Sequence, residues 1–533
     1  MATMARRDDA SILVTTPAGA FNAAVTRRLA ELEDARVPRR IWDRDPTVWK
    51  DDPGTPEIAD RLGWLTVAGA LLRQAETLTA FAAEVRASCD RVVLCGMGGS
   101  SLTGEVLRCT RGVPRGHPSL VVLDSTDPRA VAAAAAGDLA RTLFLVSSKS
   151  GTTLEPDCFF RFFWERAGGR GAQFVAITDP DTPLARLAQE RGFRRAFLNP
   201  PDIGGRYSAL SYFGLVPAAL LGLDVERLLR RAQRMAEACG PGVPAADNPA
   251  ARLGALLGAA ALSGRDKLTF VLSPGIAGFG LWAEQLTAES TGKEGKGILP
   301  VADEPLGAPE VYGRDRVFVA LTLAGEEDGA VAARLDPLER AGGHPVVRLV
   351  LEDCYDLGQE FFRWEFATAV AGAILRINPF DQPDVAESKA NTNAELERGG
   401  APSPPASATE LREFLAGIRA GDYLALMAYL PPTADYDRRL QAIRVRLRDR
   451  LKVATTLGYG PRLLHSTGQL HKGGPPTGHF LQITEAAPED VAIPGKPFTF
   501  GALEGAQAEG DLRALRARGR PAVRVEGLEP LER

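Results

Sequence analysis

From about residue 90, short apolar runs alternate with helical segments, and this rhythm restricts the fold more than any other feature. RVVLCG, SLVVLD, RTLFLVSS and AQFVAITD have the composition of buried strands, and the first is followed by a helical segment, SLTGEVLR. Strands that alternate with helices form crossover units, in which neighbouring strands run parallel. The block ends near residue 223 and predicts a parallel α/β sheet.

A second block with the same order begins at residue 265. KLTFVLSP, RVFVALTL and PVVRLVLE are its predicted strands, and GLWAEQLTAEST is a predicted helix. A long helix, QEFFRWEFATAVAGAILRI, leads to Asn378-Pro379. Because both blocks repeat strand, Gly-bearing turn and helix, the pattern predicts an internal duplication of one α/β unit.

The remaining segments predict an N-terminal helical arm and a third, smaller α/β domain. Phe21, Val25, Leu29 and Leu32 recur at helical spacing before the segment IWDRDPTVWKDDPGTP breaks the pattern. After the linker GGAPSPPAS, YLALMAYL, HFLQIT and PAVRVEG are predicted strands, and DRRLQAIRVRLRDRLK is an amphipathic helix. A chain of 533 residues is long enough for several domains. We predict an arm over 1–75, α/β domains over 76–230 and 231–398, and a C-terminal α/β domain over 408–533.

Composition excludes several classes of protein. There are 63 Lys and Arg against 67 Asp and Glu, so the net charge of −4 implies no nucleic-acid or membrane-surface role. The apolar runs, such as 366–375, are too short to cross a bilayer, and MATMARRDDA has no apolar signal core. The six cysteines form no CxxC pair, so we expect reduced thiols and a cytoplasmic protein.

Two loops after predicted strands carry the chemistry of anion binding. The first, Gly96–Ser101, departs from the GxGxxG dinucleotide pattern at Ser101, although Asp124 could hold a ribose. A tight strand-to-helix turn is the other interpretation of this loop. The second, Ser147–Thr153, surrounds one lysine with hydroxyls before a helix, whose N-terminus attracts anions. We interpret it as a monophosphate site rather than a Ser/Thr helix cap, with Gly99, Ser100, Ser148, Lys149, Ser150 and Thr153 as binding residues.

These loops carry a family resemblance. GMGGSS followed by SSKSGTT resembles the sugar-isomerase (SIS) domain, which binds phosphosugars. Residues 203–208 (IGGRYS) and 378–383 (NPFDQP) resemble signatures of phosphoglucose isomerase. The resemblance implies two flavodoxin-like SIS domains. IWDRDPTVWKDDP and the layout look most like the isomerase half of transaldolase/phosphoglucose isomerase fusions, without room for the transaldolase barrel.

Aldose–ketose isomerisation needs a base beside C1 and C2, a group that balances enediolate charge, and groups that open the sugar ring. Glu289, in a segment similar to the family's base-bearing segment, shares a helical stripe with Trp282 and Leu286 and is the predicted base. An exposed acid at a helix end is the alternative, and Glu284 and Glu294 compete for the role. The resemblance assigns Arg206 to the enediolate, Lys389 to ring opening and Gln382 to the substrate hydroxyls. A structural ion pair and a surface lysine are the ordinary alternatives for Arg206 and Lys389.

Histidine is where the sequence departs from the family. The stretch 290–343 contains no histidine, whereas LHSTGQLHKGG in the third domain resembles the His-Ser-x-Gly-Gln stretch of bacterial-type isomerases. We hypothesise that His465 opens the ring from within the same chain, with His471 as the alternate. A capping or core histidine remains an alternative. A metal site of His465, His471 and His479 lacks a supporting acid or cysteine pattern.

The predicted function is metal- and cofactor-independent interconversion of glucose 6-phosphate and fructose 6-phosphate through a cis-enediolate. The predicted partner is a small sugar phosphate, and the predicted state is a monomer or homodimer. A bifunctional phosphoglucose/phosphomannose isomerase, a non-catalytic phosphosugar-binding SIS regulator and a dinucleotide-dependent enzyme remain alternatives.

Overall fold

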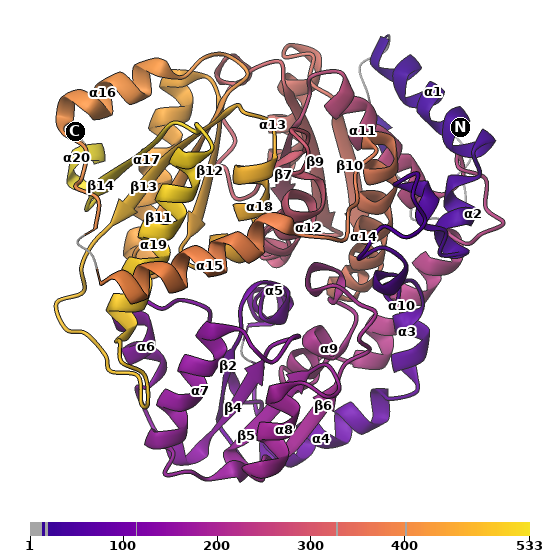
Figure 1. Ribbon diagram of the computed structural model, residues 1–533. Helices are drawn as coiled ribbons and strands as arrows, with labels where there is room; N and C mark the ends of the chain where they lie inside the picture. Colours follow the sequence, from indigo (N-terminus) through magenta and orange to yellow (C-terminus); the bar gives the residue numbers. More distant parts are fainter. Residues whose placement is uncertain (1–12, 16–19, 113, 327–328, 400–401, 533) are drawn as a thin grey trace.

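The computed structural model describes residues 13–15, 20–112, 114–326, 329–399 and 402–532, and these residues form three sheets (Figure 1). The first sheet has the order β3-β2-β4-β5-β6, all parallel. Its strands are β2 (Arg91–Cys95), β3 (Ser119–Leu123), β4 (Thr142–Ser147), β5 (Phe174–Thr178) and β6 (Arg195–Leu198). The predicted parallel α/β fold is therefore confirmed.

The order of this first sheet sets the position of a crevice. The chain leaves β2 for β3 on one side and then returns to β4 on the other side. Ligands of open parallel sheets bind at such a reversal, beyond the carboxyl ends of the two central strands. The loops at this point lead into α5 (Leu102–Arg111) and α7 (Leu154–Arg166), and they are the two loops in which phosphate chemistry was predicted.

The second sheet has the order β1-β10-β9-β7-β8. Its parallel strands are β7 (Lys267–Leu272), β8 (Leu299–Val301), β9 (Arg316–Leu323) and β10 (Val346–Leu351). Helix α12 (Phe279–Thr291) follows β7, and α14 (Leu357–Leu375) follows β10. The short strand β1 (Leu13–Thr15) pairs antiparallel with β10. The arm is therefore not purely helical, because the open edge of β10 accepts an extended segment.

The third sheet, with the order β12-β11-β13-β14, is also parallel. Its strands are β11 (Tyr423–Tyr429), β12 (Ala454–Tyr459), β13 (Gly478–Thr484) and β14 (Ala522–Glu526). The amphipathic helix is α17 (Ala434–Leu451), whose Leu440, Ile443 and Leu447 are buried. In all three sheets the first parallel strand lies between the second and the third, so one arrangement is used three times.

The N-terminal arm packs against the second unit. It contains α1 (Ala20–Asp34), α2 (Val37–Trp42), α3 (Trp64–Leu72) and α4 (Ala75–Ser88). The Trp49 indole donates to the carbonyl of Ala369 on α14 at 2.8 Å. The first helix ends before Arg36, whose φ is 51°, and Val37 begins a new helix. Helix α2 ends at Trp42, within the segment predicted to break the helical pattern, and the chain also turns earlier, at Arg36.

Two helices join the third unit to the rest of the molecule. Helix α15 (Pro383–Arg398) packs along α19 (Phe500–Ala517) across the middle of Figure 1. The Phe500 ring stacks on Phe159 of the first unit at 5.8 Å between centroids. The parallel strands of each sheet fall inside one predicted domain, whereas β1 of the second sheet comes from the predicted arm. The domain boundaries themselves stay predictions.

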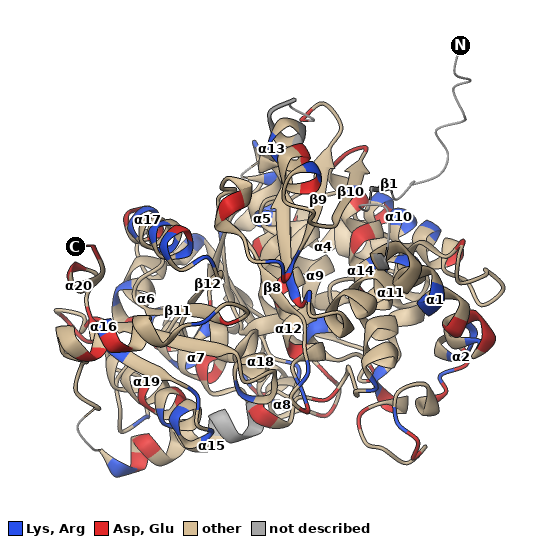
Figure 2. Ribbon diagram, turned by 90° about the horizontal axis from the view of Figure 1, so that it is seen from above, with Lys and Arg blue, Asp and Glu red and all other residues tan. Residues whose placement is uncertain are grey.

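The charges of the described residues are interspersed. Figure 2 shows basic and acidic segments alternating over the helices, including α17. None of the described helices combines the length and the apolar composition that crossing a bilayer would require.

Candidate active site

Three backbone segments meet at the carboxyl edge of the first sheet. The Ser147 hydroxyl donates to the carbonyl of Ser100 at 2.8 Å and joins the loops after β2 and β4. Gly98 has a φ of 53°, a left-handed conformation that glycine adopts readily. A Cβ on Gly99 would lie 1.9 Å from the carbonyl oxygen of Gly205, so only glycine permits the loop after β2 to approach the IGGRYS segment.

The hydroxyls of the loop after β4 contact one another. Ser148 Oγ and Thr153 Oγ1 are 2.9 Å apart, and so are Ser150 Oγ and Thr152 Oγ1. Thr153 is the N-cap of α7, yet its side chain makes no capping hydrogen bond. A hydroxyl that does not cap the helix remains available to a ligand, which favours the phosphate interpretation over the capping one.

Lys149 of this loop is held away from a simple phosphate contact. Its ammonium forms an ion pair with Asp179 and donates to the carbonyl of Pro201 at 3.0 Å. Burial raises the pKa of the Asp179 carboxyl, while the Lys149 charge acts in the opposite direction. A role of Lys149 in holding phosphate stays a prediction.

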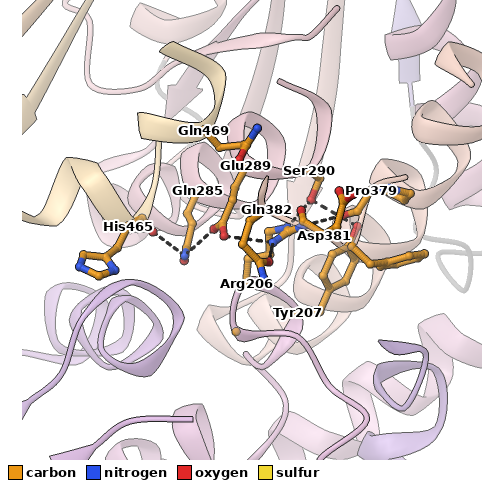
Figure 3. A network of polar contacts seen from close by, with 12 residues as sticks. Arg206, Tyr207, Gln285, Glu289, Ser290, Pro379, Asp381, Gln382, His465 and Gln469 are labelled. Atoms are coloured by element: carbon orange, nitrogen blue, oxygen red, sulfur yellow. Dashed lines mark hydrogen bonds and ion pairs between the residues drawn. The ribbon is translucent and has the colours of Figure 1, made fainter. Parts of the chain in front are cut away.

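Glu289 lies in the last turn of α12, buried with 7% exposure, with its carboxylate between two partners (Figure 3). Arg206 Nη1 lies 3.1 Å from Glu289 Oε1, and Gln285 Nε2 donates to Glu289 Oε2 at 3.0 Å. Burial excludes the interpretation of Glu289 as an exposed acid. A buried carboxylate oriented by a cation and an amide has the geometry that a general base needs.

Arg206 is held by a ring of acceptors. Its guanidinium, 1% exposed, donates to Ser290 Oγ at 2.8 Å, to Gln382 Oε1 at 2.9 Å and to the carbonyls of Pro379 and Asp381 at 2.7 and 2.8 Å. The ion pair with Glu289 therefore belongs to a network that unites the two predicted signature segments. Both interpretations of Arg206 remain open in this geometry, because a structural pair and a catalytic cation use the same contact.

His465, at the end of η10 (Arg462–His465), contacts the site in two ways. Its ring nitrogen Nε2 lies 3.0 Å from Glu155 Oε1 on α7, and its carbonyl accepts from Gln285 Nε2 at 2.7 Å. Figure 3 shows the imidazole turned away from Glu289. Glu155 also accepts from Gln507 Nε2 at 2.7 Å. The ring is thus neither a helix cap nor in contact with the base.

These contacts form one continuous chain through all three α/β units. It starts at Glu155, directly after the hydroxyl loop, and passes through His465 and Gln285 to Glu289 and Arg206. The predicted phosphate loop and the predicted base therefore lie on one connected network.

The remaining predicted residues lie around α15. Gln382 precedes the helix, and its side-chain oxygen accepts a hydrogen bond from the Arg206 guanidinium. Lys389 lies within α15, but its side chain is outside the described part of the structure, so its role stays a prediction. Gln469 on α18 (Gly468–Gly473) donates to the carbonyl of Gly292 at 3.1 Å and to Asp384 at 2.6 Å.

The competing acids lie elsewhere. Glu284 faces a small enclosed cavity that His471 also lines, and burial raises the pKa of Glu284 to about 8. Glu294 is exposed and pairs with Lys50. The Asp124 carboxylate accepts two hydrogen bonds from the Arg462 guanidinium, at 2.7 and 2.8 Å. Because these contacts occupy the carboxylate that would hold a ribose, they weaken the dinucleotide hypothesis.

The three histidines of the alternative metal hypothesis have separate surroundings. His465 contacts Glu155, His479 contacts Asp422 at 3.2 Å, and the His471 ring packs on Phe480 at 4.9 Å. Among the described residues no group of three or more His, Cys, Asp or Glu side chains is placed to hold a metal ion.

Sequence reasoning missed two residues of the network. Gln285 lies four positions before Glu289 on one helix, so the helical spacing alone could have identified it. Lys293 lies four residues after Glu289, in the segment AESTGK (288–293), and its ammonium donates to the carbonyls of Asn378 and Asp381 at 2.6 and 2.5 Å. No local pattern predicts that contact, because the partners lie in a different segment.

Comparisons with known proteins give a consistent result. No family model matches the chain. A probable glucose-6-phosphate isomerase of Haloarcula marismortui is 30% identical over 383 residues, a match that covers 64% of this chain and 86% of that protein. The glucose-6-phosphate isomerase of Symbiobacterium thermophilum is 32% identical over 391 residues, with 63% and 85% covered. The crystal structure of a glucose-6-phosphate isomerase from Chlamydia trachomatis has the same fold, with a TM-score of 0.59 and 21% identity over 73% of this chain and 89% of that one.

Proposed function

Since the chain belongs to the glucose-6-phosphate isomerase family, we propose that it interconverts glucose 6-phosphate and fructose 6-phosphate. The observation that carries the proposal is the buried Glu289 carboxylate, held between Arg206 and Gln285. A phosphosugar-binding regulator would need the hydroxyl loop but not this oriented carboxylate.

In the proposed reaction, Glu289 takes the proton from C2 of the open aldose and returns it to C1 of the cis-enediolate. The hydroxyl proton moves from O2 to O1 as C1 changes from carbonyl to alcohol and C2 from alcohol to carbonyl, so no atom is gained or lost. The carboxylate is suited to this task because two partners fix its orientation and burial excludes most of the solvent.

The enediolate carries negative charge beside O1 and O2, and the Arg206 guanidinium is the proposed counterion. It is always protonated and is already fixed by four neutral acceptors, so little reorganisation is needed when the charge develops. Gln382, which shares this guanidinium, is the proposed partner of the substrate hydroxyls. Lys389 remains the proposed group at the ring oxygen.

The phosphate group is proposed to bind at the crevice of the first sheet. The hydroxyls of Ser148, Ser150 and Thr153 contact one another in pairs or with Thr152, and phosphate oxygens would replace these contacts. Gly99 and Ser100 bring the loop after β2 alongside. Lys149 adds a positive charge nearby, although Asp179 offsets it.

Ring opening is proposed for His465. The Glu155 carboxylate 3.0 Å away orients the imidazole. Because Glu155 belongs to α7 and His465 to the third unit of the same chain, a single chain carries both groups. This supports a catalytically competent monomer, and a homodimer would carry two complete sites.

The same proposal includes a cytoplasmic location and a small sugar phosphate as partner. All six cysteines are free thiols in the structure, which supports a reducing compartment. The likeness of residues 41–53 to the isomerase half of transaldolase fusions also remains a proposal.

The decisive experiment measures conversion of fructose 6-phosphate to glucose 6-phosphate with a coupled dehydrogenase, in the presence of a chelator. Wild type is compared with Glu289→Gln and with the matched control Glu294→Gln, whose side chain is exposed. Turnover in wild type and control, lost in Glu289→Gln while sugar phosphate still binds, supports the proposal. Binding without turnover in the wild type would favour the regulator.

A further inference from the structure

Two buried cations converge on the turn that precedes α15. Arg206 donates to the carbonyls of Pro379 and Asp381, and Lys293 donates to those of Asn378 and Asp381. The Asp381 carbonyl therefore receives both cations at once. Exposed fractions of 1% for Arg206 and 4% for Lys293 place both charges out of water.

Each cation also has its own carboxylate. Lys293 Nζ lies 2.6 Å from Asp381 Oδ1, whereas Arg206 Nη1 lies 3.1 Å from Glu289 Oε1. Two positive and two negative charges thus pair off in a defined way around one turn. In a partly desolvated cluster the loss of one charge redistributes the others, since unpaired buried charges are costly.

Resting on the proposed function, we propose that Lys293 is a positioning residue, which neutralises Asp381 and thereby leaves Arg206 paired with the base Glu289. Without the ammonium, the buried cation that remains at this turn is Arg206, which already donates to the carbonyl of Asp381 at 2.8 Å. The guanidinium would then be shared between two carboxylates, and Glu289 would lose its fixed orientation.

The titration of Lys293 agrees with this position. Burial, together with the charge of Arg206, lowers the pKa of Lys293 to about 7, while Asp381 and Glu289 act in the opposite direction. These three groups are the charged neighbours that face the ammonium. The pairing with Asp381 is therefore firmest on the acid side of neutrality.

Lys296 supplies a matched control from the same turn. Its ammonium donates to the carbonyl of Leu375 at 2.9 Å and takes no part in the charge cluster. Lys293→Met should lower kcat by about 100-fold, as misplacement of a catalytic group does, whereas Lys296→Met should stay within about twofold of wild type. KM for fructose 6-phosphate should change little, because the phosphate loop lies on another unit.

A second substitution separates charge pairing from a merely structural role. Adding Asp381→Asn to Lys293→Met removes the competing carboxylate but does not restore the Lys293 hydrogen bonds to the carbonyls of Asn378 and Asp381. We expect kcat of the double variant to be at least about tenfold higher than that of Lys293→Met. In Lys293→Met the acidic limb of the kcat/KM profile should shift to higher pH, and in the double variant it should return toward that of the wild type. A structural role predicts neither recovery nor shift.

The outcomes are distinguishable from failure of the proposed function, which would appear as absence of isomerase turnover in the wild type. Normal turnover of Lys293→Met, or loss without recovery by Asp381→Asn, overturns the inference alone. If the single variant does not fold, the double variant carries the test, because neither charge is then left unpaired. A folded double variant more than about 100-fold slower than wild type would also overturn it.

Discussion

Replacing His465 by alanine tests whether this chain opens the sugar ring with its own third unit. The substitution is clean, because the carbonyl of His465, which receives Gln285, belongs to the backbone and is retained. Glu155 keeps a donor in Gln507 at 2.7 Å, so the buried carboxylate is not left without a partner. The variant should therefore fold and keep the orientation of Glu289.

The expected loss follows from what the imidazole does. A positioned general acid or base contributes about 100- to 10,000-fold, which corresponds to about 3 to 5 kcal/mol of transition-state stabilisation. We expect a decrease of this size in kcat/KM for fructose 6-phosphate, which is mainly cyclic. 5-Deoxyfructose 6-phosphate has no hydroxyl placed to close a five- or six-membered ring, so its turnover should fall by less than about threefold.

The assay is product formation for the cyclic sugar and solvent deuterium incorporation at C1 for the open-chain analogue. Mixing the His465→Ala and Glu289→Gln proteins then tests whether the imidazole and Glu289 of one site come from the same chain. A site completed within one chain predicts no recovery on mixing, whereas a site shared between subunits predicts recovered activity. Full turnover of His465→Ala on the cyclic sugar would refute the assignment.

Two further predictions concern the phosphate loop and a buried acid. Thr153→Val should raise KM for fructose 6-phosphate by about tenfold and leave kcat within about threefold of the wild type. The reason is that one hydrogen bond to a charged group contributes roughly 1.5–3 kcal/mol. An unchanged KM for the folded variant would contradict the phosphate assignment. Glu284 is predicted to destabilise the fold as pH rises, because its carboxyl ionises near pH 8 when folded and near 4.5 when unfolded. The folded state binds the extra proton between these values, so this contribution to stability is complete below about pH 4.5 and is lost as pH passes 8. Between pH 7 and 9 the free energy of unfolding of the wild type, measured by chemical denaturation, should fall by about 1.4 kcal/mol relative to that of Glu284→Gln. The same pH dependence of unfolding free energy in both proteins would contradict this account.

The fold was predictable because its signals are local. Strand and helix periodicities lie within single segments, so the three groups of strands and the two loops that follow β2 and β4 could be located from the order of short apolar runs. The short strand β1 was not predictable in this way, since its partner β10 lies more than 300 residues away. A strand of only three residues at the edge of a sheet is too short to show an alternating pattern in the sequence.

The site was predictable only in part, for the same reason. Motif residues such as Arg206 and Glu289 were identified from their own segments, and the structure brings them within 3.1 Å of each other. The partner of the His465 ring was not predictable, because Glu155 belongs to a helix of another unit. The Asp179 partner of Lys149 and the carbonyl partners of Lys293 are long-range in the same sense.

The position of His465 gives the repetition of the α/β unit a chemical meaning. The second and third sheets share one strand order, so the segment after β8 and the segment after β12 are topologically equivalent. After β8 the chain carries Glu304, which is buried against Arg316 at 3.1 Å and Thr455 at 3.0 Å. After β12 it carries His465, turned toward the first unit. Glu289 and His465 thus come from two copies of one arrangement, and a chain without the third copy would keep Glu289 and Arg206 but lose the imidazole. If His465 opens the ring as proposed, the third copy of the α/β unit supplies this group within the same chain.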